Sequence, residues 1–445
     1  MRQTPLLAAL VLLASPAVRA DTVEASSTTF LTVGPDTRYH GGTKPDTVTV
    51  APAFEILSVS ARDISTGFGE VDAVLSTWGS VDLATRRWDN GTDTSSFSGD
   101  ITTGYLQARM LDRRLTLRVG RTSVATGIAR MMQIDGGQAV AVIPAGVLDI
   151  RLSGYAGLPT SQRFQTRTGE KSWNPTAGTL AYGGRVAVAV PLSGMAGRGL
   201  EVGASVNEVR DHSDPVREEV GGDIRLQPFR TSNLALNGFG TYSLYDRRFS
   251  EASTALSVAA TRKLYLTADW RFAEPSLLLA RNSILSVFSA STWNEYGGGA
   301  RYDLGRGFHL GGDAHVRVEP GATSGTRDGA DLAGRLDWAA GRTEAGAEVS
   351  YLNAVLNGYT GARLYARREL GRGFVAADIF PQLFRKSVNG QGGAVTGTLT
   401  AGFDLAYGFS AVVSGTAGMT PYLEQSFDVM VKLAYNQTYR TVEVR

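Results

Sequence analysis

The sequence predicts an all-β protein, a transmembrane up-and-down antiparallel β-barrel of about 22 strands that follows an N-terminal signal peptide. Three observations predict this fold. The first twenty residues have the composition of an export signal, most of the remaining chain alternates apolar and polar residues, and turns interrupt the alternation at regular intervals.

The N-terminal segment MRQTPLLAALVLLASPAVRA resembles a secretory signal peptide. A basic residue, Arg2, precedes an apolar core that ends at Ala14, and small residues lead to a cleavage pattern ending at Ala20. The core is too short for a membrane-spanning helix, and no later stretch reaches the roughly eighteen apolar residues that a helical span needs. We therefore expect residues 1–20 to be a signal peptide and residues 21–445 to form one exported domain in the outer membrane.

Charge and cysteine content exclude several classes of protein. The chain has 44 Lys and Arg against 42 Asp and Glu, and removal of residues 1–20 takes away only Arg2 and Arg19, which leaves a balanced mature chain. This balance gives no indication of a nucleic-acid partner. The absence of cysteine excludes disulfides and Cys-based metal sites, so backbone pairing and packing must hold the exported chain together.

Strand-length segments with a period of two residues recur from about residue 27 to the end. The first strands are expected within 27–34 and 53–63, and clear later examples are 101–111, 147–157, 200–209, 263–272, 344–352 and 427–435. The best count is about 22 strands, and counts down to 16 stay open where a long strand has been split or a loop counted as a strand. An even number follows if both termini lie at the same end.

The stretch FHLGGDAHVRVEP, residues 308–320, shows the two faces of such a strand. Phe308 and Val316 share one side, while His309, His315 and Arg317 share the other. A soluble sandwich also buries one strand face, but it would divide into linked domains at this length, and no linker is visible. Within hydrocarbon, strands must close into a ring to pair every backbone group. We expect the Phe308 side to face lipid, as do small residues such as Ala345, Ala347 and Ala401, and the His309 side to face the lumen.

Connections of unequal length indicate two different barrel ends. Short turns such as LGRG at 304–307 and 370–373 contrast with long loops predicted at 86–100, 158–178 and 319–329. Aromatic residues near the strand ends indicate an interfacial girdle, with the general β-propensity of aromatic residues as the alternative; they are Phe308, Trp338, Phe374, Phe409 and Tyr435. At the C-terminus, either Tyr435 completes the last strand or residues 438–444 belong to it.

Residues 113–142 combine a strand with a predicted loop rich in charge. Gly120-Arg121, Gly127, Arg130 and Asp135-Gly136 follow the spacing LxxGRxxxxxGxxR and then DG. Over about thirty residues this resembles the strand–loop–strand of alginate-export-type and other porin-like barrels, although Thr122-Ser123 replaces the Gln/Glu pair of that family. The resemblance implies a loop folded toward the lumen, with Arg121, Arg130 and Asp135 forming a constriction. The alternative is a salt-bridged loop that only braces the wall.

The other candidate sites give weaker indications of a function. Residues 274–289 form an apolar stripe at helical spacing, with Ser276 as a predicted N-cap, and we expect them to tuck into the barrel mouth as a short helix or packed turn. His309, Asp313 and His315 share a strand face, but their spacing spreads them over about 20 Å, too far for one metal ion. No Gly-x-Ser-x-Gly motif accompanies the four histidines. We expect no enzyme, cofactor or metal site.

These observations predict a porin-like passive channel for small polar solutes. The side chains expected to line or constrict the pore are Arg118, Arg121, Arg130, Asp135, Arg151, Asp313, Arg317 and Glu348. Its expected partners are outer-membrane lipid, the barrel-assembly machinery during biogenesis, and the solutes themselves. The alternative is a structural or surface-interaction barrel whose lumen is closed by its own side chains and loops, since barrels of about 22 strands are commonly plugged.

Overall fold

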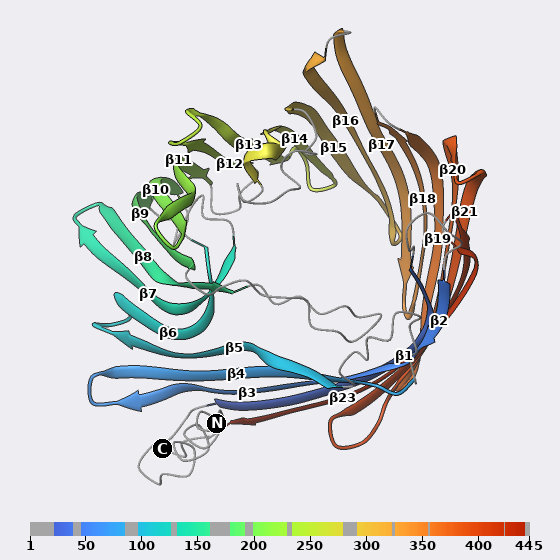
Figure 1. The fold of residues 1–445 in the computed structure, drawn as a ribbon, viewed down its shortest axis with the longest axis horizontal. Helices are drawn as coiled ribbons and strands as arrows, with labels where there is room; N and C mark the ends of the chain where they lie inside the picture. Colours follow the sequence, from blue (N-terminus) through green and yellow to red (C-terminus); the bar gives the residue numbers. More distant parts are fainter. Residues whose placement is uncertain are drawn as a thin grey trace.

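A closed antiparallel sheet forms nearly all of the protein. The computed structural model describes residues 22–38, 46–84, 97–125, 131–160, 179–191, 199–228, 234–278, 292–322, 325–354, 357–421 and 423–440, and the predicted signal peptide 1–20 lies outside them. β1 (Thr22–Arg38) pairs with β3 (Pro52–Thr66) on one side and with β23 (Leu423–Arg440) on the other, which closes the ring seen in Figure 1. The predicted fold class is confirmed.

The other strands follow one another around the ring, each paired antiparallel with the strands before and after it. They are β4 (Gly69–Asp82), β5 (Phe97–Met110), β6 (Leu115–Val124), β7 (Met132–Ala145), β8 (Leu148–Thr160), β9 (Thr179–Pro191), β10 (Gly199–Asp211), β11 (Asp214–Leu226), β12 (Leu234–Ser243), β13 (Arg248–Ala259), β14 (Leu264–Ala273), β15 (Trp293–Gly305), β16 (Phe308–Ala322), β17 (Gly325–Ala340), β18 (Thr343–Asn353), β19 (Gly358–Leu370), β20 (Gly373–Val388), β21 (Gln391–Asp404) and β22 (Phe409–Thr420).

The ring contains 22 strands, because β2 (Asp46–Val50) is the continuation of β3. Both pair with β1 in one register, Gly34 opposite Val50 and Leu31 opposite Ala53, and Ala51 alone separates them. The prediction of about 22 strands is therefore confirmed. Thr22 pairs with Arg440, so the first and last strands of the ring begin and end together, which explains the even number.

Strand register places the apolar side chains on one face of the wall. Phe308 pairs with Trp338 and Leu310 with Leu336, whereas His309 pairs with Asp337 on the other side. Many large apolar side chains on the first face are 36% exposed or more, since no protein covers them. They include Leu117, Val186, Val202, Leu310, Val316, Leu332, Val349, Leu364, Ile379, Leu399, Val413 and Val431. A membrane-spanning barrel turns this face to lipid, so we call it the outer face and the polar one the inner face.

Aromatic pairs lie on the outer face close to the short turns. The ring centroids of Phe409 and Tyr435 are 4.7 Å apart, and those of Phe308 and Trp338 are 6.1 Å apart. The prediction for Phe374 is wrong, because β20 carries Val375 and Ile379 outward and turns the opposite parity inward. Both C-terminal alternatives hold in part: Tyr435 is an outer aromatic, and β23 continues to Arg440.

The two ends of the barrel differ in the length of their connections. At the end where β1 begins and β23 ends, neighbouring strands are joined by short turns such as 306–307, 341–342 and 371–372. At the opposite end, long connections follow β4, β8 and β14, and most of their residues lie outside the described ranges. The long loop predicted at 319–329 is wrong, because β16 and β17 extend to Ala322 and Gly325 and leave a two-residue connection.

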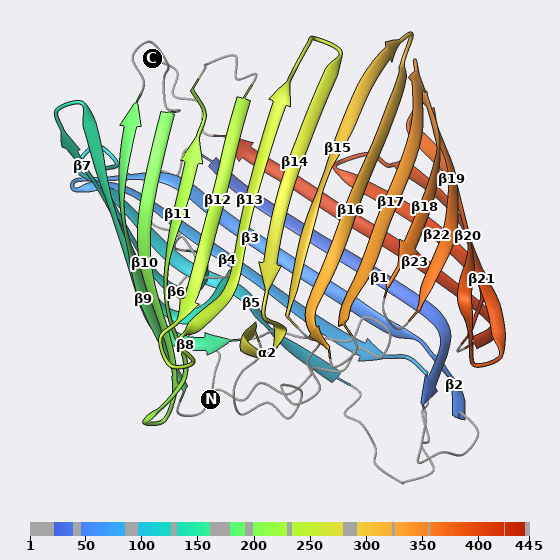
Figure 2. The ribbon, with the colours of Figure 1, turned by 90° about the horizontal axis from the view of Figure 1, so that it is seen from above.

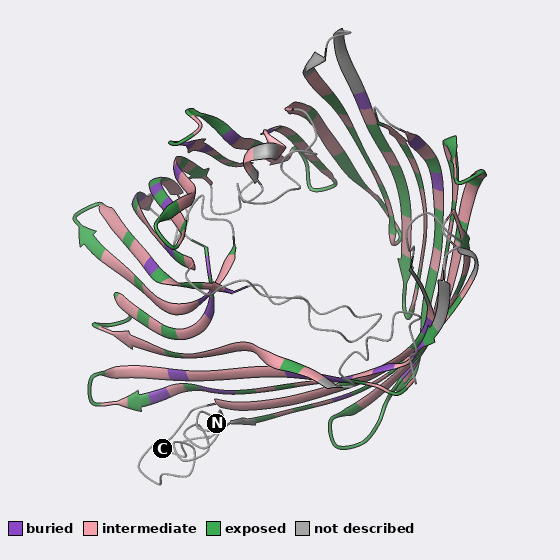
Figure 3. Cartoon of the chain, in the orientation of Figure 1, coloured by how far each residue is buried: buried purple, intermediate pink, exposed green. Residues whose placement is uncertain are grey.

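A row of glycines bends the wall at β6, β7 and β8. Gly120 pairs with Gly136, which pairs with Gly157. Gly120 has a φ of +126°, and a Cβ there would lie 2.2 Å from the carbonyl oxygen of Gly104, so only glycine fits. Beyond this row the strand ends turn toward the centre of the ring in Figure 1. The inner face of these strand ends is buried, whereas Figure 3 shows that most of the barrel wall is exposed or only partly buried.

One short helix, α2 (Pro275–Leu278), follows β14 and contacts β13. Figure 2 shows it at the opposite end of the barrel from the β15–β16 turn, where the sequence placed a short helix. The predicted cap at Ser276 is wrong, because Ser276 lies inside the helix, while residues 279–289 of the predicted stripe lie outside the described ranges. Within the described ranges no helix has the length and apolar character needed to cross a membrane.

Candidate functional site

The inner face of the barrel carries the charged residues that could contact a solute. Because facing residues of neighbouring strands project to the same side, register alone brings together acidic and basic side chains that are far apart in sequence. Among the described residues, four networks of this kind occur around the ring, on β3–β6, β8–β11, β14–β16 and β17–β20.

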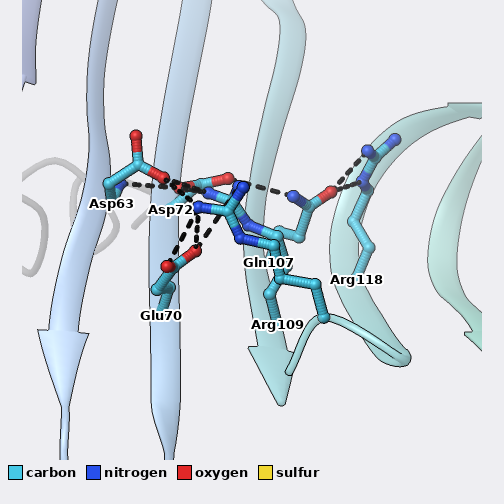
Figure 4. Close-up of polar contacts among 7 residues, drawn as sticks. Asp63, Glu70, Asp72, Gln107, Arg109 and Arg118 are labelled. Atoms are coloured by element: carbon cyan, nitrogen blue, oxygen red, sulfur yellow. Dashed lines mark hydrogen bonds and ion pairs between the residues drawn. The ribbon is translucent and has the colours of Figure 1, made fainter. Parts of the chain in front are cut away.

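The first network is centred on Arg109 of β5 (Figure 4). Its guanidinium donates to Asp63 at 2.9 Å and to Asp72, and it lies 3.6 Å from Glu70. The carboxylate of Asp72, which is 10% exposed, also accepts from the backbone N–H of Asp63 at 2.9 Å. In the adjoining turn, the hydrogen bond to Glu70 raises the pKa of Arg113 above its ordinary value. Three carboxylates therefore hold Arg109 firmly against the wall.

Gln107 connects this network to Arg118, one of the predicted pore-lining residues. The Gln107 amide donates to Asp72 at 2.9 Å and accepts from Arg118 Nε at 3.0 Å (Figure 4). Arg118 also lies over the ring of Tyr105, 4.6 Å from its centroid, and donates to Thr122 at 3.2 Å. The structure thus places Arg118 on the inner face, fixed by an aromatic ring below it and polar groups on both sides.

The second network joins four consecutive strands, β8 to β11. Arg151 donates to Glu201 at 2.6 Å, and Arg185 donates to Glu201 at 2.8 Å. Arg185 also donates through Nε to Asp223 at 2.9 Å. Two arginines and two carboxylates therefore neutralise each other. Arg151 was predicted as a pore-lining residue, and it belongs to this network.

The third network lies on β14–β16 and includes His315, one of the two histidines of the stretch 308–320. His315 Nε2 lies 3.2 Å from Asp269, and its Nδ1 lies 3.9 Å from Asp313. Arg317 donates to Glu295 at 2.9 Å and stacks on Trp293, 4.3 Å from the ring centroid. Asp313 and Arg317, two predicted pore-lining residues, therefore lie on one strand within the same network.

The fourth network surrounds Tyr365 of β19. Arg335 donates to Asp337 at 2.7 Å and to the Tyr365 hydroxyl at 3.0 Å, and Tyr365 in turn donates to Asp337. Arg363 donates to Asp378 at 2.7 Å and lies 5.4 Å from the Tyr365 ring centroid. Glu348, the last predicted pore-lining residue, faces both Arg335 and Arg363 across the strands. Phe374, also on the inner face, lies under Arg367 at 4.4 Å.

Arg121 and Asp135 form a separate pair in the β6–β7 ladder, where they face each other directly. Arg121 donates to Asp135 through Nε at 2.6 Å, to Asp100 at 3.0 Å and to the backbone carbonyl of Ile101 at 2.8 Å. By alternation they share the side of Leu117, not that of Arg118. The predicted loop containing both residues is wrong, because β6 continues to Val124 and β7 begins at Met132.

This pair lies beside the point where backbone pairing between β5 and β6 ends. The backbone ladder between β5 and β6 stops at Gly104 opposite Arg121, so the carbonyls of Ile101 and Thr102 have no strand partner on that side. Arg121 and Gln133 donate to these two carbonyls from the neighbouring strands. Side chains therefore continue the connection where backbone pairing ends, which corresponds to the bracing role that the sequence left as an alternative.

Among the predicted site residues that the structure describes, Arg121 and Asp135 are the only two in direct contact. Arg130 lies outside the described ranges, and the others are distributed over β6, β8, β16 and β18. A single constriction formed by these residues stays a prediction. Sequence reasoning missed Arg109, Asp72, Arg185 and Asp223, although alternation within their segments was a signal for their inward direction.

The described residues hold no cluster of three or more histidine or acidic side chains suited to a metal ion. The residues of the inner face instead provide paired guanidinium and carboxylate groups, in contact with aromatic rings. Such a surface can bind and release small polar or charged solutes without covalent chemistry.

Comparison with known proteins gives similarity at the level of structure. No family model and no curated protein matches the sequence. The chain is similar to OccAB4 of Acinetobacter baumannii, with 8% identity, a TM-score of 0.48, and coverage of 96% of this chain and 100% of that one. It is also similar to Pseudomonas aeruginosa OpdK, solved with vanillate (10%, 0.46, 94% and 99%), and to the PapC translocation pore of the P pilus usher (10%, 0.42, 95% and 100%).

Proposed function

We propose that the protein is a porin-like passive channel of the outer membrane that admits small polar solutes. The observation that carries this proposal is the closed ring of 22 strands with an apolar outer face and a charged inner face. A ring of this size encloses a wide lumen, and charged side chains on its inner face favour water over hydrocarbon there. Outer-membrane lipid is then the partner of the outer face, and the barrel-assembly machinery inserts the chain.

The inner charges support weak selectivity between anions and cations. Most inner arginines have a carboxylate partner within hydrogen-bond distance, as Arg185 has Asp223 and Arg317 has Glu295. Neighbouring opposite charges cancel at a distance, so the field along the pore axis is small and any residual field acts across it. Selectivity would then depend on size and on local contacts.

Planar-bilayer recording tests the channel directly. Folded protein should produce stepwise conductance increments, and the reversal potential in a salt gradient should lie close to zero. Heat-unfolded protein at the same concentration is the control for detergent artefacts. A folded preparation that gives no conductance steps would exclude the channel.

A second function, a structural barrel with a closed lumen, is favoured by one observation. Four side chains near the ends of β6–β9 are 5% exposed or less: Val124, Ile134, Tyr155 and Ala181. Since Val124 and Tyr155 belong to the inner face, part of that face is covered. Steady absence of conductance together with binding of the barrel to a cell-surface ligand would support this second function.

A further inference from the structure

One inner arginine is not neutralised by a hydrogen-bonded partner. Arg301 of β15 is exposed, and among the described residues it interacts electrostatically with Asp337, whose carboxylate is already hydrogen-bonded to Arg335 and Tyr365. The arginines of the four inner networks, in contrast, donate to at least one carboxylate or amide each. A guanidinium has five N–H donors and does not lose its charge, so Arg301 can donate hydrogen bonds to a further partner.

A cavity adjoins this arginine on the inner face. Its volume is about 150 Å³, and it is lined by Arg301, His309, Gly311, Arg335 and Asp337. Strand register explains the opening: Gly311 pairs with Arg301 on one side and with Arg335 on the other. A Cβ at Gly311 would have one heavy atom within 4 Å, at 3.9 Å. The absence of a side chain there therefore leaves space between two guanidinium groups.

The carboxylates around this cavity are already engaged. Asp337 accepts hydrogen bonds from Arg335 Nε and from the Tyr365 hydroxyl. Asp303 accepts from the backbone N–H of Gly305 at 2.7 Å, and its carboxylate lies 3.9 Å from His309 Nδ1. Arg335 keeps further N–H groups in addition to the two that donate to Asp337 and Tyr365. The unused hydrogen-bonding capacity of the cavity is thus mainly that of donors.

We propose that this cavity binds a small oxyanion, in the form of a phosphate, sulfate or carboxylate group, between Arg301 and Arg335. Planar guanidinium groups match the spacing of two oxyanion oxygens, and His309 adds a further ring nitrogen. The volume equals that of about five water molecules at roughly 30 Å³ each, which suits one such group with part of its hydration. This inference rests on the proposed function, because a permeating solute is what would reach the inner face.

Isothermal titration of the folded protein in detergent with sodium phosphate tests the site. We expect saturable binding that Arg301→Gln weakens by about tenfold or more, since a charged donor is lost. Gly311→Val should have a similar effect by filling the cavity while keeping both arginines. Arg342→Gln, in the β17–β18 turn, is the matched control and should leave the dissociation constant within about twofold.

Two arms of the titration separate the sources of the oxyanion. Equal affinity for inorganic phosphate and for glycerol phosphate indicates a group carried by a larger solute, and preference for inorganic phosphate indicates the free ion. Absence of phosphate binding by folded wild-type protein, or binding that neither variant weakens, would overturn the site. If bilayers show conductance steps but titration shows no binding, the inference alone fails; binding without steps would instead contradict the channel.

Discussion

At the scale of single residues, several arginines of the inner wall are held in place by more than one partner. Arg118 has an amide, a hydroxyl and an aromatic ring, and Arg185 has two carboxylates. A side chain fixed in this way loses little further entropy when a solute contacts it. The inner face is therefore a rigid charged surface, and Arg301 is an exception to this arrangement.

Arg121 is the residue whose loss should destabilise the wall most clearly. Its side chain is 19% exposed and joins β6 to Asp135 of β7 and to Asp100 and Ile101 of β5. Arg121→Gln should lower the free energy of unfolding by about 2–3 kcal/mol, because two partly buried carboxylates lose their partner. The measurement is the guanidinium unfolding curve of the protein in detergent, followed by tryptophan fluorescence.

Arg317→Gln is the matched control for this prediction. Arg317 also pairs with a carboxylate, Glu295, but its side chain is 45% exposed, so the change should cost about 1 kcal/mol or less. Equal losses for the two variants would contradict the bracing role of Arg121.

The sequence predicted the direction of several single residues and failed for others. Arg118 was placed inward correctly, because its segment alternates without interruption. Phe374 was placed outward because it follows the same LGRG turn as Phe308, yet β20 has the opposite parity after its turn. A turn motif does not fix which face follows it. The partners of Arg109 were inaccessible to sequence reasoning, because Asp63 and Asp72 approach it only through register.

At the scale of strands, the ladder between β5 and β6 has the fewest register pairs of any two neighbouring strands of the ring, among the residues that the structure describes. It contains the pairs from Gly104–Arg121 to Met110–Leu115, whereas β4 and β5 pair from Val81–Phe97 to Glu70–Arg109. The glycine row Gly120–Gly136–Gly157 begins beside the point where this ladder ends. The bend of β6–β8 and the end of the ladder are therefore parts of one feature.

Gly120→Ala should disturb that feature. The φ of +126° is unfavourable for alanine, and its Cβ would lie 2.2 Å from the Gly104 carbonyl oxygen on β5. We expect a loss of at least about 1–3 kcal/mol in unfolding free energy, measured by guanidinium unfolding in detergent. Gly415→Ala on β22 is the control, since a Cβ there meets no heavy atom within 4 Å. An unchanged stability for Gly120→Ala would mean that the bend does not require glycine.

Strand positions were predicted better than strand ends. The segments chosen for their alternation all fall on strands to within one residue, for example 263–272 on β14, which begins at Leu264, and 344–352 on β18. The ends were wrong where polar residues, glycine or proline suggested a loop, as at 319–329 and between Arg121 and Asp135. In a barrel, pairing with both neighbours extends strands through residues of low β-propensity, and a single sequence does not contain that information.

At the scale of the whole molecule, stability and function depend on the same separation of faces. Adjacent residues on a strand experience different environments: Leu332 of β17 is 45% exposed on the outer face, while Ala333 faces Asp313 and Ser350 on the inner face. The register partners of Leu332, Ala314 and Tyr351, place it within the apolar band, away from the girdle at Phe308 and Trp338. Leu332 and Ala333 are adjacent in the sequence but lie on opposite faces. Substituting each of them therefore tests which face of the wall meets lipid.

Leu332→Arg should destabilise the protein in lipid vesicles by about 2–4 kcal/mol, because an arginine near the middle of the bilayer loses its hydration. Ala333→Arg should cost far less, since the new guanidinium lies in the lumen opposite the Asp313 carboxylate. The measurement is the guanidinium midpoint of vesicle-embedded protein, with resistance of folded protein to heat and detergent as a check on insertion. If Ala333→Arg were the more damaging change, the assignment of the two faces would be reversed, and with it the charged lining on which the channel depends.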